Sequence, residues 1–339
     1  MSVFLAVEDL QVSFSTPDGT VRAVDGVSFS LERGQTLGIV GESGSGKSAM
    51  SLAILGLQTG RNCRVGGQIW LDQENLLAAA PGRVRDLRGA SMAMIFQDPL
   101  SALHPYYAVG WQIAEAYRAK NPVTRKQSWA RAVEMLGRVG IPQPQQRAHD
   151  YPHQFSGGMR QRAMIAMALS CEPELLIADE PTTALDVTVQ AQILELITDL
   201  QAELRTAVII ITHDLGIVAE VADETLVMYS GQVMEQGSTG QVFQAPQHPY
   251  TWGLLTSVTG LNRPRRDRLV AIPGSPPSLI DLPSGCPFHP RCRYADQTGG
   301  LASHSRPGLR EASPGHWVAC HLTDASRAQA FEQEVQPAL

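Results

Sequence analysis

The sequence predicts an α/β fold in which helices cover both faces of a mostly parallel β-sheet. Continuous apolar runs at residues 36–40, 175–179 and 207–212 have the length of buried strands. Segments with helical periodicity alternate with these runs, as the spacing of apolar residues in 187–204 indicates. This alternation is typical of parallel sheets, because each crossover helix packs back on the sheet.

Length and charge restrict the classes of function. A chain of 339 residues fits one large α/β domain plus an appendage, which we expect at 1–240 and 241–339. A formal net charge of -6 gives no general attraction to nucleic acid, which is therefore not an expected partner. No apolar run approaches the about 20 residues that cross a bilayer. The N-terminus lacks a basic-then-apolar export signal, so we expect the chain in the cytosol.

The N-terminal part predicts a small antiparallel sheet. Residues 5–31 alternate as in strands, with turns expected at 16–19 and near Asp25 and Gly26, and a further strand is expected at 67–71. Phe14 lies in this sheet. Its ring has two equally supported interpretations, a stacking face for a nucleotide base or an ordinary core residue.

The middle of the chain predicts a helical subdomain inserted into the α/β core. After an apolar strand at 91–96, helical periodicity dominates from 101 to 162, and we place the subdomain at about 99–165. A hairpin at 227–233 closes this part of the chain near residue 240.

A glycine-rich loop between the strand at 36–40 and a helix-like segment at 49–57 has the pattern of a phosphate-binding loop. Its glycines allow a sharp turn that aims successive N–H groups at an anion, beside the positive end of a helix. Lys47 adds a charge that reaches the β- and γ-phosphates, and the Ser48 hydroxyl suits Mg²⁺. We expect a nucleoside triphosphate to bind at Gly41, Ser43, Gly44, Ser45, Gly46, Lys47 and Ser48.

Polar residues end several predicted strands, at the edge where ligands of α/β folds collect. Asp179 and Glu180 end the strand at 175–179, and their side chains differ in direction because strand residues alternate. We expect Asp179 to hold Mg²⁺ through water and Glu180 to act as the general base, although acidic residues also end strands as helix caps. Gln97 suits contact with the metal water and the attacking water, and His213 adds a second polar group.

A second glycine-containing helix start lies far along the chain, at Ser156, Gly157 and Gly158, and predicts another anion-binding helix N-terminus. With this segment, the chain resembles the ATP-binding cassette ATPases, the motor subunits of membrane transporters. The resemblance covers residues 1 to about 240 and rests on the phosphate loop, Gln97, residues 155–159, Asp179, Glu180, the loop 183–186 and His213.

The resemblance implies an active ATPase that works as a pair. In that family two cassettes pair head to tail, so Ser156 and Gly158 of one chain would complete the γ-phosphate site at Lys47 of the other, and Asp186 would communicate across the pair. The implied fold is a P-loop nucleotide-binding α/β core with an antiparallel β subdomain and a helical subdomain that touches the membrane subunits. An irregular C-terminal extension would follow. Two positions depart from the usual signature without removing its Ser-Gly-Gly: Phe155 and Met159.

The residues after 240 resemble the C-terminal extension of the ATPases of dipeptide, oligopeptide and nickel importers. The segments that carry this resemblance are 247–251, 271–274, 285–292 and 315–321. Relatives with this tail carry four cysteines and can hold a [4Fe-4S] cluster, whereas this chain has Cys286, Cys292 and Cys320 and no cysteine near Gly299. Either a histidine replaces the missing ligand or the thiols remain without a cluster. The candidate histidines are His289, His304, His316 and His321.

These features predict the ATP-hydrolysing subunit of a bacterial importer of di- or oligopeptides, which uses ATP and Mg²⁺ at the cytoplasmic face of the inner membrane. The expected partners are a second cassette subunit, identical or related, two integral membrane permeases and, indirectly, a substrate-binding protein. Two alternatives stay open. A nickel or metal-chelate importer would share nearly every motif, and a soluble cassette protein outside transport would usually carry two cassettes or a long coiled coil.

Overall fold

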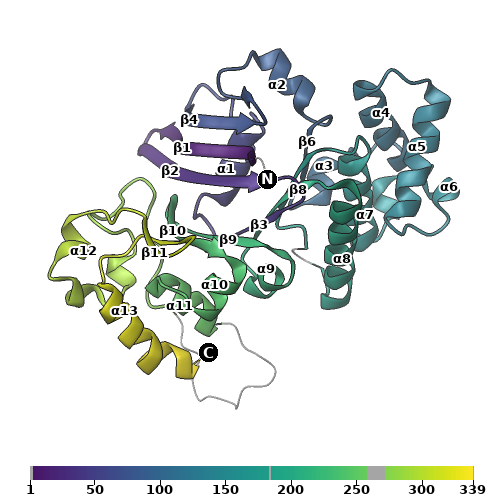
Figure 1. Cartoon of the computed structure of the whole chain (residues 1–339). Coiled ribbons are helices and arrows are strands. Elements are labelled where there is room, and N and C mark those ends of the chain that lie inside the picture. The colour runs from purple at the N-terminus through teal and green to yellow at the C-terminus, as the bar shows by residue number, and fades with distance from the viewer. Residues whose placement is uncertain (1–2, 183–184, 258–271, 339) are drawn as a thin grey trace.

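The computed structural model describes residues 3–182, 185–257 and 272–338 as two β-sheets with helices around them (Figure 1). The larger sheet has the strand order β11 (Arg310–Ser313), β12 (His316–Val318), β10 (Gln232–Ser238), β9 (Glu224–Tyr229), β3 (Thr36–Val40), β8 (Ala207–Thr212), β7 (Leu175–Asp179) and β6 (Met92–Ile95). The smaller sheet has the order β2 (Gly19–Glu32), β1 (Val3–Thr16), β4 (Cys63–Leu71) and β5 (Glu74–Asn75).

The centre of the larger sheet is parallel, which confirms the predicted fold class. Strand β3 pairs parallel with β8 and β9, and β7 pairs parallel with β8 and β6. Residues of β7 alternate between two cores. Leu175 and Ile177 pack in the core that includes α1 (Lys47–Ile54), whereas Leu176 and Ala178 pack in the core that includes α8 (Val187–Leu204). Helices therefore bury both faces of this strand.

The smaller sheet is antiparallel, as predicted, but one of its two expected turns is wrong. β2 continues through Asp25 and Gly26 instead of turning there. The register shifts between Leu10 and Gln11, which pair with Val27 and Asp25, so Gly26 is the extra residue of a β-bulge with φ 81°. Because a glycine at positive φ serves a bulge as well as a turn, the sequence alone does not separate them.

Helices fill the region between β6 and β7. Figure 1 shows α4, α5 and α6 beyond the β6 edge of the larger sheet, with α7 between them and the sheet. The elements are α3 (Pro99–Ala102), α4 (Val109–Lys120), α5 (Arg125–Arg138), α6 (Pro144–Arg147), η1 (Pro152–Gln154) and α7 (Gly157–Leu169); α2 (Pro81–Leu87) precedes β6. In the part of the chain that the structure describes, no helix combines the length and apolarity of a membrane span.

The tail is built onto the larger sheet. Strand β12 pairs antiparallel with β10, so the sheet continues past residue 240, where the sequence analysis placed a domain boundary. Helix α9 (Leu215–Val221) lies before β9 and is not part of the tail. The helical elements that follow β10 are α10 (Thr239–Gln244), α11 (Pro249–Ser257), η2 (His289–Arg291), η3 (Ala295–Thr298), α12 (Leu301–His304), α13 (Asp324–Ala330), η4 (Phe331–Val335) and η5 (Gln336–Ala338). Much of the tail between these short elements is irregular, as expected.

A buried carboxylate joins the tail to β10. Glu235 is 0% exposed and accepts hydrogen bonds from the backbone N–H groups of Gln247 (2.6 Å) and His248 (2.9 Å). Its Oε1 also lies 2.7 Å from His316 Nε2 on β12. A buried carboxylate is tolerated only when such partners replace water, so this residue depends on the tail being in place.

We expect Glu235→Ala to lower the free energy of unfolding by about 3 kcal/mol, because the buried N–H of His248, the partly buried N–H of Gln247 and the His316 ring lose their acceptor. Urea unfolding measures the change. Glu195→Ala, which truncates an exposed carboxylate on α8, is the matched control and should stay within about 0.5 kcal/mol of the unchanged protein. Equal effects of the two substitutions would show that the buried acceptor does not anchor the tail.

Candidate nucleotide-binding site

The glycine-rich loop joins β3 to α1 and is held tightly between the two sheets. A Cβ atom on Gly41 would lie 2.2 Å from the Met228 carbonyl oxygen of β9. A Cβ on Gly46 would lie 2.1 Å from the Ala23 carbonyl oxygen of β2, and Gly46 has φ 100°. Both positions therefore require glycine.

Lys47 begins α1 and its side chain turns back into the loop. The Nζ atom donates hydrogen bonds to the carbonyl oxygens of Gly41 (2.7 Å) and Glu42 (2.9 Å) and to Ser45 Oγ (3.2 Å). Burial lowers the pKa of Lys47, and the carboxylates of Glu180, Asp179 and Glu42 oppose this shift. A buried cation surrounded by a turn of backbone suits a phosphate group.

Asp179 ends β7 beside the same loop. Burial raises the pKa of this carboxyl, and the hydrogen bond from the Ser48 hydroxyl lowers it. A hydroxyl oxygen and a carboxylate oxygen in contact are the hard ligands that Mg²⁺ prefers, usually together with water and substrate phosphate. The residues present therefore fit the predicted magnesium site.

Glu180 lies between the two polar residues that were predicted to accompany it. Gln97 Nε2 donates to Glu180 Oε2 (2.8 Å), and His213 Nδ1 lies 3.3 Å from Glu180 Oε1. These residues follow β6, β7 and β8, whose carboxyl ends meet at one edge of the sheet. Glu180 has φ 48°, an uncommon conformation for a residue with a side chain, and its N–H donates to the Ile211 carbonyl oxygen (2.8 Å). The backbone thus holds the carboxylate at this edge.

The second predicted helix start is open to solvent. Ser156 is the N-cap of α7 and its Oγ accepts a hydrogen bond from the Met159 N–H (3.3 Å). A Cβ on Gly157 would meet no heavy atom within 4 Å, whereas one on Gly158 would approach Val189 Cγ1 at 3.0 Å. No hydrogen bond among the described residues joins this helix start to the phosphate loop.

Two other predicted residues have ordinary local roles within one chain. Asp186 is the N-cap of α8 and accepts a hydrogen bond from the Val189 N–H (3.0 Å). Thr183 and Ala184 of the same loop lie outside the described residues. Phe14 is half-buried against the core of the smaller sheet. Base stacking by Phe14 and communication through Asp186 stay predictions.

The structure adds two residues that the sequence analysis missed, Tyr250 and Arg291. Both belong to the tail, and both contact Glu42 in the phosphate loop. They are 208 and 249 residues away from Glu42 in the sequence, and no local pattern signals such pairs.

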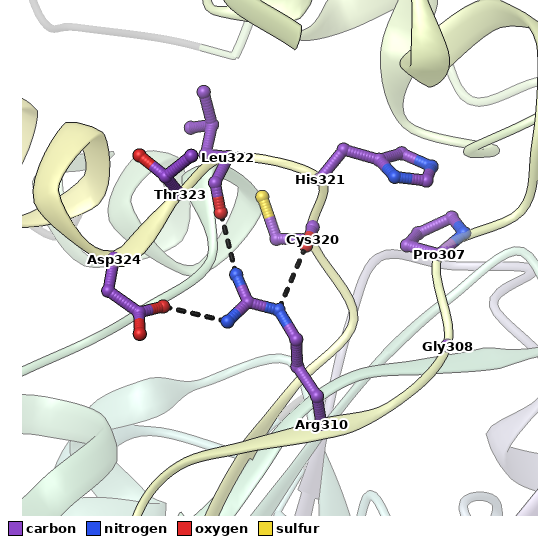
Figure 2. A pocket seen from close by; sticks show the side chains of 8 residues that line it. All are labelled: Pro307, Gly308, Arg310, Cys320, His321, Leu322, Thr323 and Asp324. Carbon is purple, nitrogen blue, oxygen red and sulfur yellow. Dashed lines mark hydrogen bonds and ion pairs between the residues drawn. The ribbon is translucent and has the colours of Figure 1, made fainter.

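The three tail cysteines lie near one another in a largely apolar environment. Burial raises the pKa of Cys286 to about 11 and that of Cys292 to about 12, and it also raises the pKa of Cys320. Cys320 lines a pocket of about 460 Å³ with Arg310 and His321, and Figure 2 shows the His321 ring pointing away from the sulfur. Within the described ranges, no three His, Cys, Asp or Glu side chains are placed to hold a metal ion together.

The candidate histidine ligands have other partners. His316 contacts Glu235, and the ring nitrogens of the others approach backbone carbonyl oxygens: His289 and Cys286 (2.9 Å), His304 and Gly300 (2.8 Å), and His321 and Ser305 (2.7 Å). His316 is therefore oriented by β10, and the other three rings are oriented by backbone of the tail itself.

Comparison with known proteins identifies the family. A family model described as ABC transporter matches residues 24–183, and one described as oligopeptide/dipeptide transporter, C-terminal region, matches residues 234–298. The chain is 49% identical to the oligopeptide transport ATP-binding protein OppD of Salmonella typhimurium, over 94% of this chain and 93% of that protein. It is also 49% identical to the dipeptide transport ATP-binding protein DppD of Bacillus subtilis, over 96% of each.

The fold points to the same family. The solved structure of cbiO1 from Clostridium perfringens, described as part of the ABC transporter complex cbiONQ, matches with a TM-score of 0.61. The match has 30% sequence identity and covers 72% of this chain and 92% of that one. The family resemblance of the sequence motifs is thereby confirmed. The chain belongs to the ABC transporter family, as an ATPase subunit that carries the C-terminal region of the oligopeptide/dipeptide transporters.

Proposed function

We propose that this chain hydrolyses ATP to energise the uptake of di- or oligopeptides through separate membrane permeases. The observation that carries the proposal is the convergence of Lys47, Asp179 and Glu180 at one edge of the sheet, with Glu180 held by Gln97 and His213. The tail match and the names of the relatives support a peptide cargo.

The geometry supports a division of roles for hydrolysis. Lys47 and the loop N–H groups would bind the β- and γ-phosphates, while Ser48, Asp179 and Gln97 would hold Mg²⁺, which neutralises phosphate charge when bound. Glu180 would accept a proton from the attacking water as the bond between the terminal phosphorus and its bridging oxygen breaks.

His213 would keep the Glu180 carboxylate in position during this step. Its ring lies 3.3 Å from Glu180 Oε1, opposite the oxygen that Gln97 contacts. Protein groups thus orient both carboxylate oxygens, which would reduce the reorganisation that the reaction requires.

Pairing of two cassettes would complete the site. The exposed start of α7, with Ser156 and Gly157, offers free space and oriented N–H groups to the γ-phosphate held at Lys47 of a partner chain. The proposal leaves the partner as a second copy or a related subunit, and Asp186 and Phe14 keep their predicted roles within it. The cassette would span residues 1–240 and the tail 241–339.

An aromatic patch on the helical region supports contact with permeases at the cytoplasmic face of the membrane. Tyr106, Tyr107 and Trp111 are 82%, 47% and 45% exposed, and the rings of Tyr107 and Trp111 stack with centroids 4.5 Å apart. The patch follows Gln97 in the chain and lies at the start of α4. Exposed aromatic side chains of this kind are enriched at protein interfaces.

We propose that the three tail thiols pack in the tail core instead of binding an iron–sulfur cluster. Cys286 packs in an apolar cluster with Tyr250 and Phe288, and Cys292 and Cys320 pack against a second apolar cluster that includes Trp252 and Tyr294. The orientation of the four histidines toward other partners also supports this view.

Glu180→Gln should lower ATP hydrolysis at least about 100-fold while leaving ATP binding intact, because an amide cannot accept the proton but Lys47 still meets the phosphates. Phosphate release by the protein assembled with its permeases gives the rate, and a fluorescent nucleotide gives the affinity. Glu195→Gln on α8 is the matched control. Hydrolysis at the unchanged rate would remove Glu180 from the role of base.

Gly157→Glu should abolish ATP-dependent pairing while each chain still binds ATP, because the new carboxylate would face the partner's γ-phosphate. The substitution is tolerated by the fold, since a side chain there enters open space. Gly240→Glu on α10, also directed into open space, is the control. The mass of the Glu180→Gln protein with ATP, with and without each substitution, reports pairing. Normal pairing of the Gly157→Glu chain would contradict the head-to-tail arrangement.

Anaerobically purified protein should contain far less iron and acid-labile sulfide than one cluster per chain requires. Metal and sulfide analysis measures both, and the triple substitution of Cys286, Cys292 and Cys320 by serine sets the background. Stoichiometric iron and sulfide that the triple substitution removes would establish a cluster and contradict packing thiols.

A further inference from the structure

Two residues of the tail form hydrogen bonds with Glu42 of the phosphate loop. Arg291 Nη1 donates to Glu42 Oε2 (2.5 Å) and Nη2 donates to Glu42 Oε1 (3.0 Å), so the guanidinium and the carboxylate form a two-point pair. The backbone N–H of Glu42 donates to the Tyr250 hydroxyl (2.8 Å). Glu42 follows Gly41 directly, so both contacts act on the loop that holds Lys47.

The two tail residues are themselves fixed. The Arg291 side chain is 5% exposed, and its Nε donates to the Pro273 carbonyl oxygen (2.8 Å). Tyr250 is 0% exposed, and its ring lies against Phe288, with centroids 5.3 Å apart. Burial lowers the pKa of Arg291, but the hydrogen bonds and charges of Glu42 and Tyr229 together outweigh it, and the net shift is upward. Arg291 is therefore a permanent cation in a rigid position.

The Arg291–Glu42 ion pair affects nucleotide binding because the Glu42 carboxylate is negatively charged, like the phosphates. This carboxylate is 28% exposed and lies close enough to the Lys47 ammonium to oppose, with Glu180 and Asp179, the lowering of the Lys47 pKa by burial. A carboxylate without a counter-ion at this place would repel a triphosphate, and partial burial would reduce screening by water. The Arg291 guanidinium removes most of that penalty.

We propose that Arg291 and Tyr250 are positioning residues for ATP: from the tail they fix Glu42 and neutralise its charge, so that the phosphate loop accepts a triphosphate. The inference rests on the proposed role of this loop in ATP binding. Neither residue is among the hydrogen-bond partners of Glu180, Gln97 or His213 in the described part of the chain, so they act on affinity and not on the proton transfer.

Arg291→Met should raise the KM for ATP about 10-fold and change kcat by less than about 2-fold, because it leaves the Glu42 carboxylate beside the phosphates without its partner. Glu42→Gln should leave KM within about 3-fold of the unchanged protein, since the amide carries no charge. The double substitution should then return KM to within about 3-fold of Glu42→Gln. This rescue separates a charge effect from general loss of packing. ATPase assays on the complete chain with its permeases give all four values.

Arg306→Met is the matched control. Arg306 joins the tail to the smaller sheet, because its guanidinium donates to Asp25 Oδ2 (2.7 Å) and to the Asp25 carbonyl oxygen (2.6 Å). Its substitution should leave the KM for ATP unchanged. Lys47→Ala tests the loop itself: retained ATP binding there would contradict the proposed function. Two other outcomes would contradict only the present inference, provided that Lys47→Ala loses ATP binding. One is a normal KM for Arg291→Met. The other is a double substitution, Arg291→Met with Glu42→Gln, whose KM stays as high as that of Arg291→Met.

A second variant tests the same inference if the first one does not fold. Should Arg291→Met fail to fold, Arg291→Lys keeps the charge but loses the two-point contact and the bond to Pro273. It should raise KM by about 3-fold with kcat unchanged and a normal unfolding midpoint. An unchanged KM in this variant would overturn the role of Arg291.

Discussion

The site depends on the close approach of the phosphate loop to backbone carbonyls of two different sheets. Gly41 lies against Met228 in β9 and Gly46 against Ala23 in β2, with no room for a Cβ atom at either position. The Gly231 N–H also donates to the Ser45 carbonyl oxygen (2.9 Å). The relative position of the two sheets therefore sets the loop conformation. The loop in turn positions the Lys47 ammonium, which donates hydrogen bonds to loop carbonyl oxygens. Any larger residue at the two glycines would move both sheets or open the loop.

The parts of the site that local patterns define were predictable from the sequence. Gln97, Glu180 and His213 each follow a strand of the parallel sheet, and parallel strands bring their carboxyl ends to one edge, so the meeting of these side chains follows from the fold class. The bulge at Gly26 was not predictable, because a glycine at positive φ fits a turn equally well. Nor were the partners of Glu42, because pairs across 208 and 249 residues depend on the tertiary fold and not on spacing.

The tail could not be assigned from periodicity for a related reason. Its strands β11 and β12 are short, and β12 is anchored through a polar side chain, His316, which contacts the buried Glu235. A charged residue in the middle of β10 is normally taken as a solvent-facing position, yet Glu235 is completely buried. Burial of a carboxylate requires specific donors, and here the tail supplies them all from segments beyond residue 240. The tail is thus a structural part of the sheet that carries the site.

ATP binding to this loop, as proposed, would exchange hydrogen bonds of the Lys47 ammonium. The Lys47 ammonium donates to the Gly41 and Glu42 carbonyl oxygens, and in the proposed site phosphate oxygens would take over part of this coordination. The loop keeps its shape during the exchange only if other contacts hold it. Glu42 has such contacts at its other polar groups, because its N–H is bound by Tyr250 and its carboxylate by Arg291. The tail therefore acts on the surroundings of the Lys47 ammonium through Glu42, and on the present proposal a change in the tail would alter the charge and geometry that a triphosphate encounters.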